Sequence, residues 1–255
     1  MPPSAASRRR VRAPSAVRPY AEVLREALEG DTTRRKGART RDRLRVAAAE
    51  ALDARGYTRL RVSDICARAG VSPAAFYQYF PNREAITVDV LSDFVQTTVR
   101  LAEPVAPAAT RFEAIYSANL AFVASARVNA GLVRCLLQLG DQVPSFRRRA
   151  ERLNVEWYEH VARSIVRNAR IGDARLNAVR LAVHALGGMM DDVARTMLLA
   201  PSADTRRLLR DTAPSDEALA EFLSVLWYRA LFGRAPKPLR HAASRTLCTV
   251  QREGT

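Results

Sequence analysis

Residues 71–80 read VSPAAFYQYF and are the most informative part of the sequence for the fold. Ser72 is a side-chain type that caps the N-terminus of a helix, and Pro73 suits the first helical position. Four of the last five residues are aromatic, although aromatic residues make up only 7% of the chain. In a helix, Phe76 and Phe80 lie one turn apart on the same face, whereas the two tyrosines point elsewhere. The stretch therefore predicts a short helix with one buried aromatic face and one polar face.

The residues before this stretch predict two further helices. Thr40 is expected to cap a helix that runs to Arg55, with Gly56 just past its end. A second helix is expected from about Val62 to Ala69, because apolar residues recur there at the spacing of one helix face. Gly70 then supplies a turn into the helix of about Pro73 to Tyr79. Two short helices joined by a glycine turn are the elements of a helix-turn-helix, whose second helix enters the DNA major groove.

The rest of the chain also predicts helices, so we expect an all-α fold without strands. Pro19 to Leu28 can form a short helix that Gly30 would stop, and Asn82 is expected to cap a helix that runs to about Leu101. Glycine and proline residues separate five longer segments beyond it. These segments are placed at about residues 108–126, 128–140, 144–170, 174–200 and 215–233.

The formal net charge of +15 favours an anionic partner, which can be nucleic acid, an acidic lipid surface or an anionic small molecule. Residues 1–45 hold 13 Lys and Arg against 5 Asp and Glu, whereas residues 46–100 hold 6 of each. Part of this excess is also what an arginine-rich coding bias would produce. The concentration of charge near the N-terminus nevertheless points to a basic arm that adds non-specific affinity for DNA or lies in a minor groove.

The sequence lacks the signatures of several classes of protein. No apolar run approaches the ~18–20 residues that cross a bilayer, and no secretory signal follows the N-terminal arginines. Cys66, Cys135 and Cys248 are too widely spaced for a metal or disulfide framework, which predicts a reduced, cytoplasmic protein. No glycine-rich phosphate loop, GxSxG or HExxH occurs. We therefore expect neither an enzyme nor a metal site, and no cofactor.

The segment ICARAGVSPAAFYQYFPNREAI, Ile65–Ile86, closely resembles the DNA-binding domain of TetR-family transcriptional regulators, and the resemblance extends over Thr40–Leu91. The family pattern has an Ile-Ala pair, then Ala-Gly-Val-Ser, a hydrophobic-Tyr pair, an aromatic residue or His before Phe, and a final small residue, Lys and Glu. Nearly every element stands here at the right spacing. Cys66 replaces an Ala of the pattern, and we interpret it as a packing residue rather than a redox sensor.

The resemblance implies DNA contacts by residues at the ends of the first two helices and on the recognition helix. Phosphate contacts are implied for Thr40, Ser63, Tyr77, Tyr79 and Arg83, and base-facing positions for Ser72, Pro73, Ala74, Ala75 and Gln78. Arg61 occupies the capping position where the family usually has Thr, and it can itself reach a phosphate. Because Pro, Ala and Ala offer few hydrogen bonds to bases, DNA shape and the arm are expected to add specificity.

The same resemblance implies a second, helical domain that dimerises and holds a small-molecule pocket. The expected division is a basic, partly disordered arm over residues 1–38, a TetR-type helix-turn-helix domain over 39–101, a ligand-binding and dimerisation domain over 102–233, and a basic tail over 234–255. A homodimer is expected through the last two long helices. Residues suited to that close helix contact are Leu181, Leu186, Gly187, Gly188, Leu223, Leu226 and Ala230.

Aromatic and polar residues on otherwise apolar helix faces are candidates for the pocket, although each also fits ordinary core packing. They are Phe112, Tyr116, Asn119, Phe122, Gln138, Trp157, Tyr158, His184, Met189, Met190 and Trp227. The expected effector is a small hydrophobic or acyl-type molecule. The sequence as a whole predicts a dimeric, ligand-responsive repressor that binds a near-palindromic operator. The alternatives are an activator of the same architecture and an architectural or division-site DNA-binding protein without an effector.

Overall fold

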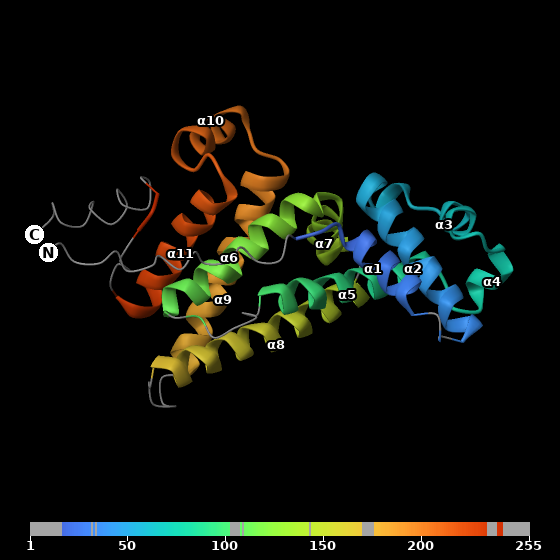
Figure 1. Cartoon of the computed structure of the whole chain (residues 1–255), viewed down its shortest axis with the longest axis horizontal. Coiled ribbons are helices and arrows are strands. Elements are labelled where there is room, and N and C mark those ends of the chain that lie inside the picture. Colours follow the sequence, from blue (N-terminus) through green and yellow to red (C-terminus); the bar gives the residue numbers. More distant parts are fainter. Residues whose placement is uncertain are drawn as a thin grey trace, which may run out of the picture.

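A computed structural model describes residues 17–102, 110–142, 144–169, 176–233 and 239–241, apart from residues 32 and 34, together with residue 108. Helices are the only regular secondary structure in this part of the chain, which contains no strand, and this confirms the predicted all-α fold (Figure 1). In chain order the elements are α1 (Tyr20–Gly30), α2 (Lys36–Arg55), η1 (Tyr57–Arg59), α3 (Val62–Ala69), α4 (Pro73–Tyr77), α5 (Arg83–Ala102), α6 (Arg111–Val128), α7 (Ala130–Gln142), α8 (Pro144–Ala169), α9 (Leu176–Val193), η3 (Ala194–Leu199), α10 (Ala203–Thr212) and α11 (Asp216–Phe232).

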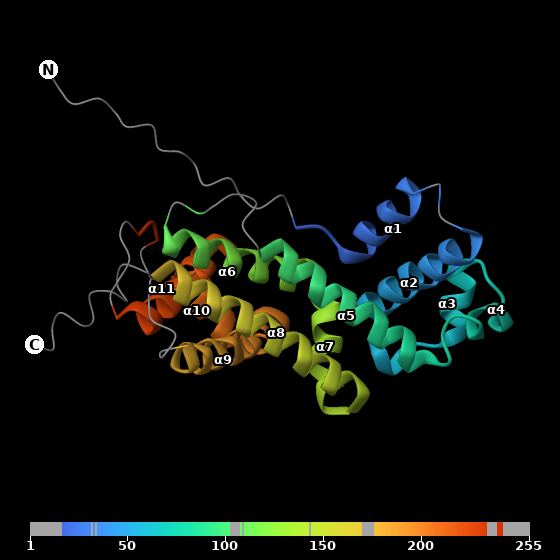
Figure 2. The same ribbon diagram turned by 90° about the horizontal axis from the view of Figure 1, so that it is seen from below.

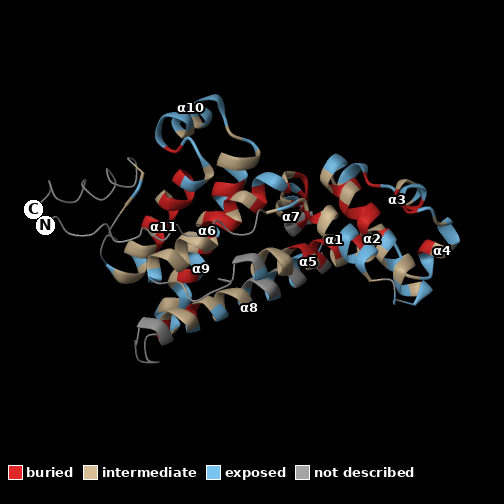
Figure 3. Cartoon of the chain, in the orientation of Figure 1, coloured by how far each residue is buried: buried red, intermediate tan, exposed pale blue. Residues whose placement is uncertain are grey.

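The buried side chains form two cores, one at each end of an elongated molecule (Figure 3). The first core joins α2, α3, α4 and the first half of α5, and α7 contributes Leu132, Cys135 and Leu139 to it. The second core lies between α6, α8, α9 and α11. Helix α5 packs on α2 at one end and on α6 and α8 further along, so that it links the two halves (Figure 2).

Local capping signals account for the start of several helices. Ser72 Oγ accepts a hydrogen bond from the Ala75 backbone N–H at 3.2 Å, and Asn82 Oδ1 accepts one from the Ala85 N–H at 2.8 Å. Both side chains satisfy amide groups that have no acceptor within their own helix. Gly70 has a left-handed φ of 64° in the turn between α3 and α4. The predicted caps Ser72 and Asn82, the turn at Gly70 and the bounds of α3 are confirmed.

Three boundaries differ from the prediction. Helix α2 begins at Lys36, so Thr40 is not its cap; instead Thr40 Oγ1 donates to the Lys36 carbonyl at 3.1 Å. Helix α4 ends at Tyr77 instead of Tyr79. The segment 174–200 was predicted as one helix, but the α-helical part is Leu176–Val193 and a π-helical segment, η3, completes it.

The stretch between Pro201 and Pro214, which was predicted as a break, contains a helix, α10. Ser202 Oγ accepts from the Thr205 N–H at 3.1 Å and caps it. Few apolar residues occur in α10, and Leu208 on it is exposed. The helix is short, contains only two leucines and lies between two prolines, which is why the sequence interpretation placed a break there.

The predicted N-terminal arm of residues 1–38 contains an ordered, packed helix. Residues 1–16 lie outside the described part, whereas α1 packs against α2 and its Tyr20 is buried. Of the predicted basic tail, only residues 239–241 are described. There the buried Glu221 carboxylate accepts the backbone N–H groups of Arg240 and His241 at 2.8–3.2 Å.

No single helix among the described residues is both long enough and apolar enough to cross a membrane. Only α6 and α7 taken together reach that length and apolarity, and they are bent by 96° at their junction.

Candidate nucleic-acid interface

Helices α3 and α4 lie at the end of the molecule farthest from α9 and α11 (Figure 1). The side chains of Phe76 and Phe80 are buried beneath α4, with ring centroids 6.0 Å apart. Because α4 has only five residues, these two anchors and the Ser72 cap fix its orientation more than its own hydrogen bonds do. The outer face of α4 is thereby held rigidly toward solvent.

The predicted base-facing residues form that outer face. Ser72, Pro73, Ala74 and Gln78 are exposed, and Ala75 is half-buried. The surface carries two methyl groups, a proline ring, a hydroxyl and one amide. It can contact a groove closely but offers few hydrogen bonds to base edges.

The two tyrosines of α4 and its C-terminal turn have different surroundings. Tyr77 is 57% exposed and touches the structure mainly through an edge-on contact of its ring with Phe76, at a centroid distance of 5.3 Å. Tyr79 is half-buried and packs against the first core. Its hydroxyl lies beside Gly37 on α2, 3.5 Å from where a side chain there would begin. Tyr77 is therefore free to meet a ligand, whereas Tyr79 also joins α2 to the recognition segment.

Arg61 and Ser63 are exposed at the N-terminus of α3, on either side of its first residue. The predicted phosphate-binding Arg83 is half-buried and has contacts of its own. Its Nη1 donates to the Leu60 carbonyl at 3.0 Å, and its guanidinium lies over the Tyr57 ring at 4.4 Å. Arg83 thus holds the segment between η1 and α3, and only its remaining N–H groups can face a phosphate.

The structure adds a basic cluster at the boundary between the predicted N-terminal arm and the predicted helix-turn-helix domain, which the sequence interpretation did not single out. Lys36, Arg39 and Arg43 project from the first two turns of α2 and, with Thr40, line a shallow hollow of ≈ 320 Å³. The contact between Gly37 and Tyr79 places this end of α2 beside the recognition segment. The sequence contained a signal for this cluster, because its basic residues are spaced by three and four positions. In a helix that begins at Lys36, this spacing places them on one face.

Cys66, which replaces an alanine in the family pattern, is buried against the first core. Burial raises the pKa of its thiol, which lowers the fraction of reactive thiolate. These surroundings agree with the interpretation of Cys66 as a packing residue.

The structure brings only some of the pocket candidates together. Phe122, Tyr158, Met189, Met190 and Trp227 pack in the second core. Asn119 Nδ2 donates to Ser224 Oγ at 2.9 Å in the buried contact between α6 and α11. Tyr158 meets His184 edge-on at 4.9 Å, and burial raises the pKa of the Tyr158 hydroxyl to about 12.

Other candidates lie apart from that core. Gln138 is exposed on α7, and Trp157 stacks on His160 along α8 at 5.9 Å. Phe112 packs edge-on against Tyr228 at 5.8 Å, and Tyr116 is half-buried. Within the residues that the structure describes, no group of three or more His, Cys, Asp or Glu side chains could hold a metal ion.

Two short helices joined by the Gly70 turn, with an exposed second helix anchored by buried aromatics, define a helix-turn-helix DNA-binding protein. Residues 44–90 match the family model described as bacterial regulatory proteins, tetR family. Over these residues the chain therefore carries a DNA-binding domain similar to that of the TetR family of transcriptional regulators, as the sequence predicted. Regulators of this family are DNA-binding proteins and not enzymes.

Individual relatives agree with this assignment. YdgC, an HTH-type transcriptional regulator of Bacillus subtilis strain 168, is 38% identical over 68 residues, which are 27% of this chain and 35% of that protein. Salmonella enterica GusR shares the fold with a TM-score of 0.59 and 15% identity, over 77% of this chain and 97% of that one. The fatty acid degradation regulator FadR from Bacillus halodurans also shares the fold, with a TM-score of 0.55 and 19% identity, over 82% of this chain and 100% of that one. The two structural likenesses concern the fold alone.

Proposed function

We propose that the protein is a dimeric, ligand-responsive repressor that binds a near-palindromic operator. The observation that carries this proposal is the exposed face of α4, from Ser72 to Gln78, held rigidly on the buried Phe76 and Phe80. Such a face enters a major groove, and two copies related by a two-fold axis would place it in two half-sites ~34–36 Å apart.

Contacts to the phosphate backbone are assigned to residues around that face. Tyr77 is exposed beside the recognition surface, and Arg61 and Ser63 are exposed at the start of α3. The basic cluster Lys36, Arg39 and Arg43 adds positive charge on the α2 side. These groups would fix the register of the protein on DNA, while the small residues of α4 and the local DNA shape select the sequence.

Dimerisation is assigned to α9 and α11, and the burial of individual side chains favours some of their residues over others for this contact. Leu181 is 73% exposed, and Ala185 and Gly188 are exposed on the same face of α9 at positions i+4 and i+7. By contrast, Gly187 packs against Tyr158 of its own chain, and Leu223 is buried in the second core. The face with Leu181, Ala185 and Gly188 is the part of α9 that a partner could cover.

The effector is assigned to the second core. Trp227 is buried there, and its indole Nε1–H has no hydrogen-bond acceptor among the described residues. A buried donor without an acceptor costs ~1–3 kcal/mol. An apolar or acyl-type effector that carries a carbonyl or carboxylate oxygen would relieve this cost. FadR, whose fold is similar, regulates fatty acid degradation.

The coupling between effector and DNA is assigned to α5, which packs on the DNA-binding helices at one end and on α6 and α8 at the other. An effector that favours a shifted α5 would move the two recognition helices out of register with the operator. A difference of ~100-fold in affinity between the two states corresponds to ~2.7 kcal/mol of coupling.

The test begins with selection of double-stranded DNA by the purified full-length protein. We expect an enriched near-palindrome that one dimer occupies, and its release by an apolar or acyl-type compound from a ligand panel. Binding without sequence preference would contradict a role as operator-specific regulator. Sequence-specific binding that no compound releases would contradict the proposed response to a ligand. A rise in transcription when the protein binds would show that it is an activator.

A further inference from the structure

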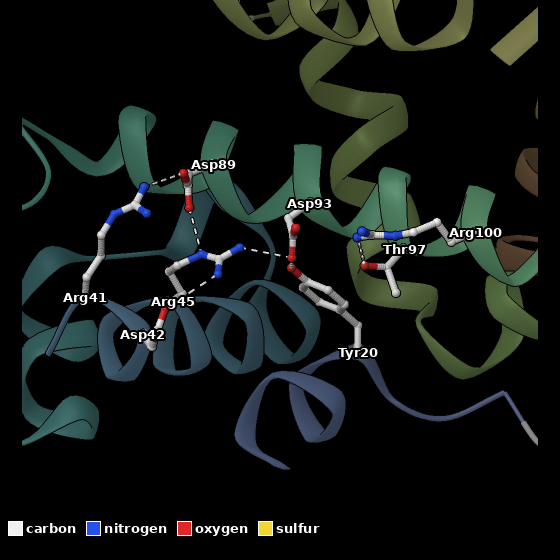
Figure 4. A network of polar contacts seen from close by, with 8 residues as sticks. All are labelled: Tyr20, Arg41, Asp42, Arg45, Asp89, Asp93, Thr97 and Arg100. Carbon is white, nitrogen blue, oxygen red and sulfur yellow. Dashed lines mark hydrogen bonds and ion pairs between the residues drawn. The ribbon is translucent and has the colours of Figure 1, made fainter. Parts of the chain in front are cut away.

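Helix α1 precedes the helix-turn-helix and is anchored by its first residue (Figure 4). Tyr20 is 2% exposed, and its hydroxyl donates to Asp93 Oδ2 on α5 at 2.6 Å. Its backbone N–H donates to Asn129 Oδ1 at 2.7 Å, and its ring meets Phe94 edge-on at 5.3 Å. The first N–H groups of a helix have no acceptor within it, so Asn129 satisfies one that would otherwise be buried and unpaired.

Asp93 connects this anchor to the DNA-binding half. Arg45 of α2 pairs with Asp93 at 3.0 Å and with Asp89 at 2.8 Å. Burial, and then the bond to Asp93, raise the pKa of the Tyr20 hydroxyl far above its ordinary value. The hydroxyl therefore stays protonated and remains a donor. Figure 4 shows Tyr20, Asp93 and Arg45 in one continuous network across α1, α5 and α2.

Asn129 connects the anchor to the second half of the molecule. It lies in the turn between α6 and α7, and its Nδ2 donates to the Ser125 carbonyl at 3.2 Å, which fixes the orientation of its amide. Asp53 of α2 holds the other side of the same corner, because its Oδ1 accepts the Gly131 and Leu132 N–H groups at 2.9 and 3.2 Å. The α6–α7 corner is thus held by α1 and by α2.

Tyr20 makes the main contact between α1 and α5, through Asp93 and Phe94. Beyond it, a hollow of ≈ 400 Å³ lies between the two helices, lined on one side by Val23, Leu24 and Ala27 and on the other by Thr97 and Arg100. The rest of α1 instead packs on α2 and pairs Arg25 with Glu50. A change at Tyr20 would therefore loosen α5 and the corner while leaving most of the α1–α2 packing in place.

We propose that Tyr20 is a positioning residue for operator binding, which fixes the DNA-binding half to α5 and to the α6–α7 corner in one orientation. Its two hydrogen bonds can form together only while α5 and the corner keep their present places relative to α1. A two-fold operator requires a fixed separation of two recognition helices, whereas non-specific binding does not. The proposal rests on the proposed function for its effect on operator binding.

The test compares Tyr20→Phe, which keeps the ring and the backbone N–H, with Tyr228→Phe on α11 as a matched control. The full-length proteins are titrated with the operator selected by the wild type and with a scrambled duplex. We expect Tyr20→Phe to weaken operator binding by roughly 3- to 10-fold, a change that lies within the range of couplings through packed elements. Binding to the scrambled duplex should not change, and the control should match the wild type in both.

Hydrogen exchange at the Gly131 and Leu132 amides gives a readout that needs no DNA. Tyr20→Phe should raise the exchange rate there, because α1 loses its side-chain hydrogen bond to Asp93 and can then move away from Asn129, which weakens one of the two supports of the corner. The positioning role would be overturned by an unchanged exchange rate at these two amides, by an unchanged operator affinity, or by an equal loss of affinity for the operator and the scrambled duplex. If the wild type showed no sequence preference at all, the operator-binding function would fail instead, and the exchange rates alone would decide whether Tyr20 holds the corner.

Discussion

At the scale of single residues, the recognition segment separates side chains that hold the fold from side chains that can meet DNA. Phe76 and Phe80 are buried anchors, and Tyr79 is shared between the core and the Gly37 contact. Tyr77 alone among these aromatics projects into solvent. An exposed phenol beside a short helix contributes little to stability, so its role is best sought in binding.

Tyr77→Phe should therefore weaken binding to operator and scrambled DNA alike, by about 1 kcal/mol per protomer, since one hydrogen bond to phosphate is lost. The thermal unfolding midpoint should not change. Because a phenol is neutral, the slope of log affinity against log salt should also stay the same, whereas Lys36→Gln should reduce it by ~0.9 per protomer. Affinities measured over a range of salt concentrations check both variants. Unchanged affinity of Tyr77→Phe would exclude the phosphate contact.

At the scale of elements, the approach of α7 to α2 depends on a missing side chain. A Cβ on Gly131 would lie 1.8 Å from the Asp53 carbonyl oxygen, well inside contact distance. The close approach lets the Asp53 carboxylate cap α7, where a negative charge is favoured. Glycine at this position is thus required by space and not by backbone conformation.

Gly131→Ala should force α7 away from α2 and destabilise the protein by about 1–3 kcal/mol, as overpacking does. Gly30→Ala is the matched control, because nothing lies within 4 Å of a Cβ at the end of α1. Urea unfolding followed by circular dichroism would compare the two. A Gly131→Ala protein as stable as the control would show that α7 can move at no cost.

At the scale of the whole molecule, the large hydrophobic side chain that is most exposed among the described residues lies on α9. Leu181 is 73% exposed, in line with Ala185 and Gly188. A single isolated leucine on a surface is ordinary, but one in line with small residues suits a close helix contact. The proposed dimer would cover this face and set the distance between the two recognition helices.

Leu181→Glu should therefore convert the dimer into a monomer and weaken operator binding, because a charge would be buried at the contact. Leu208→Glu on α10 is the matched control, since Leu208 is 58% exposed outside the proposed contact. Sedimentation velocity at micromolar concentration would distinguish the two states. If Leu181→Glu still formed dimers with the dissociation constant of the wild type, the interface would lie elsewhere on the molecule.

Sequence reasoning was enough to predict the features that depend on neighbouring residues: the helix-turn-helix, the Ser72 and Asn82 caps, the Gly70 turn and the buried face of the recognition helix. These follow from steric and hydrogen-bonding rules that act over a few positions. The docking of α1 and the Gly131 contact, in contrast, became visible only in the folded chain. Tyr20 and Asn129 are 109 residues apart, and Asp53 and Gly131 are 78 apart, so no local pattern encodes either contact. Both depend on which helices meet, and that is settled only when the two cores pack.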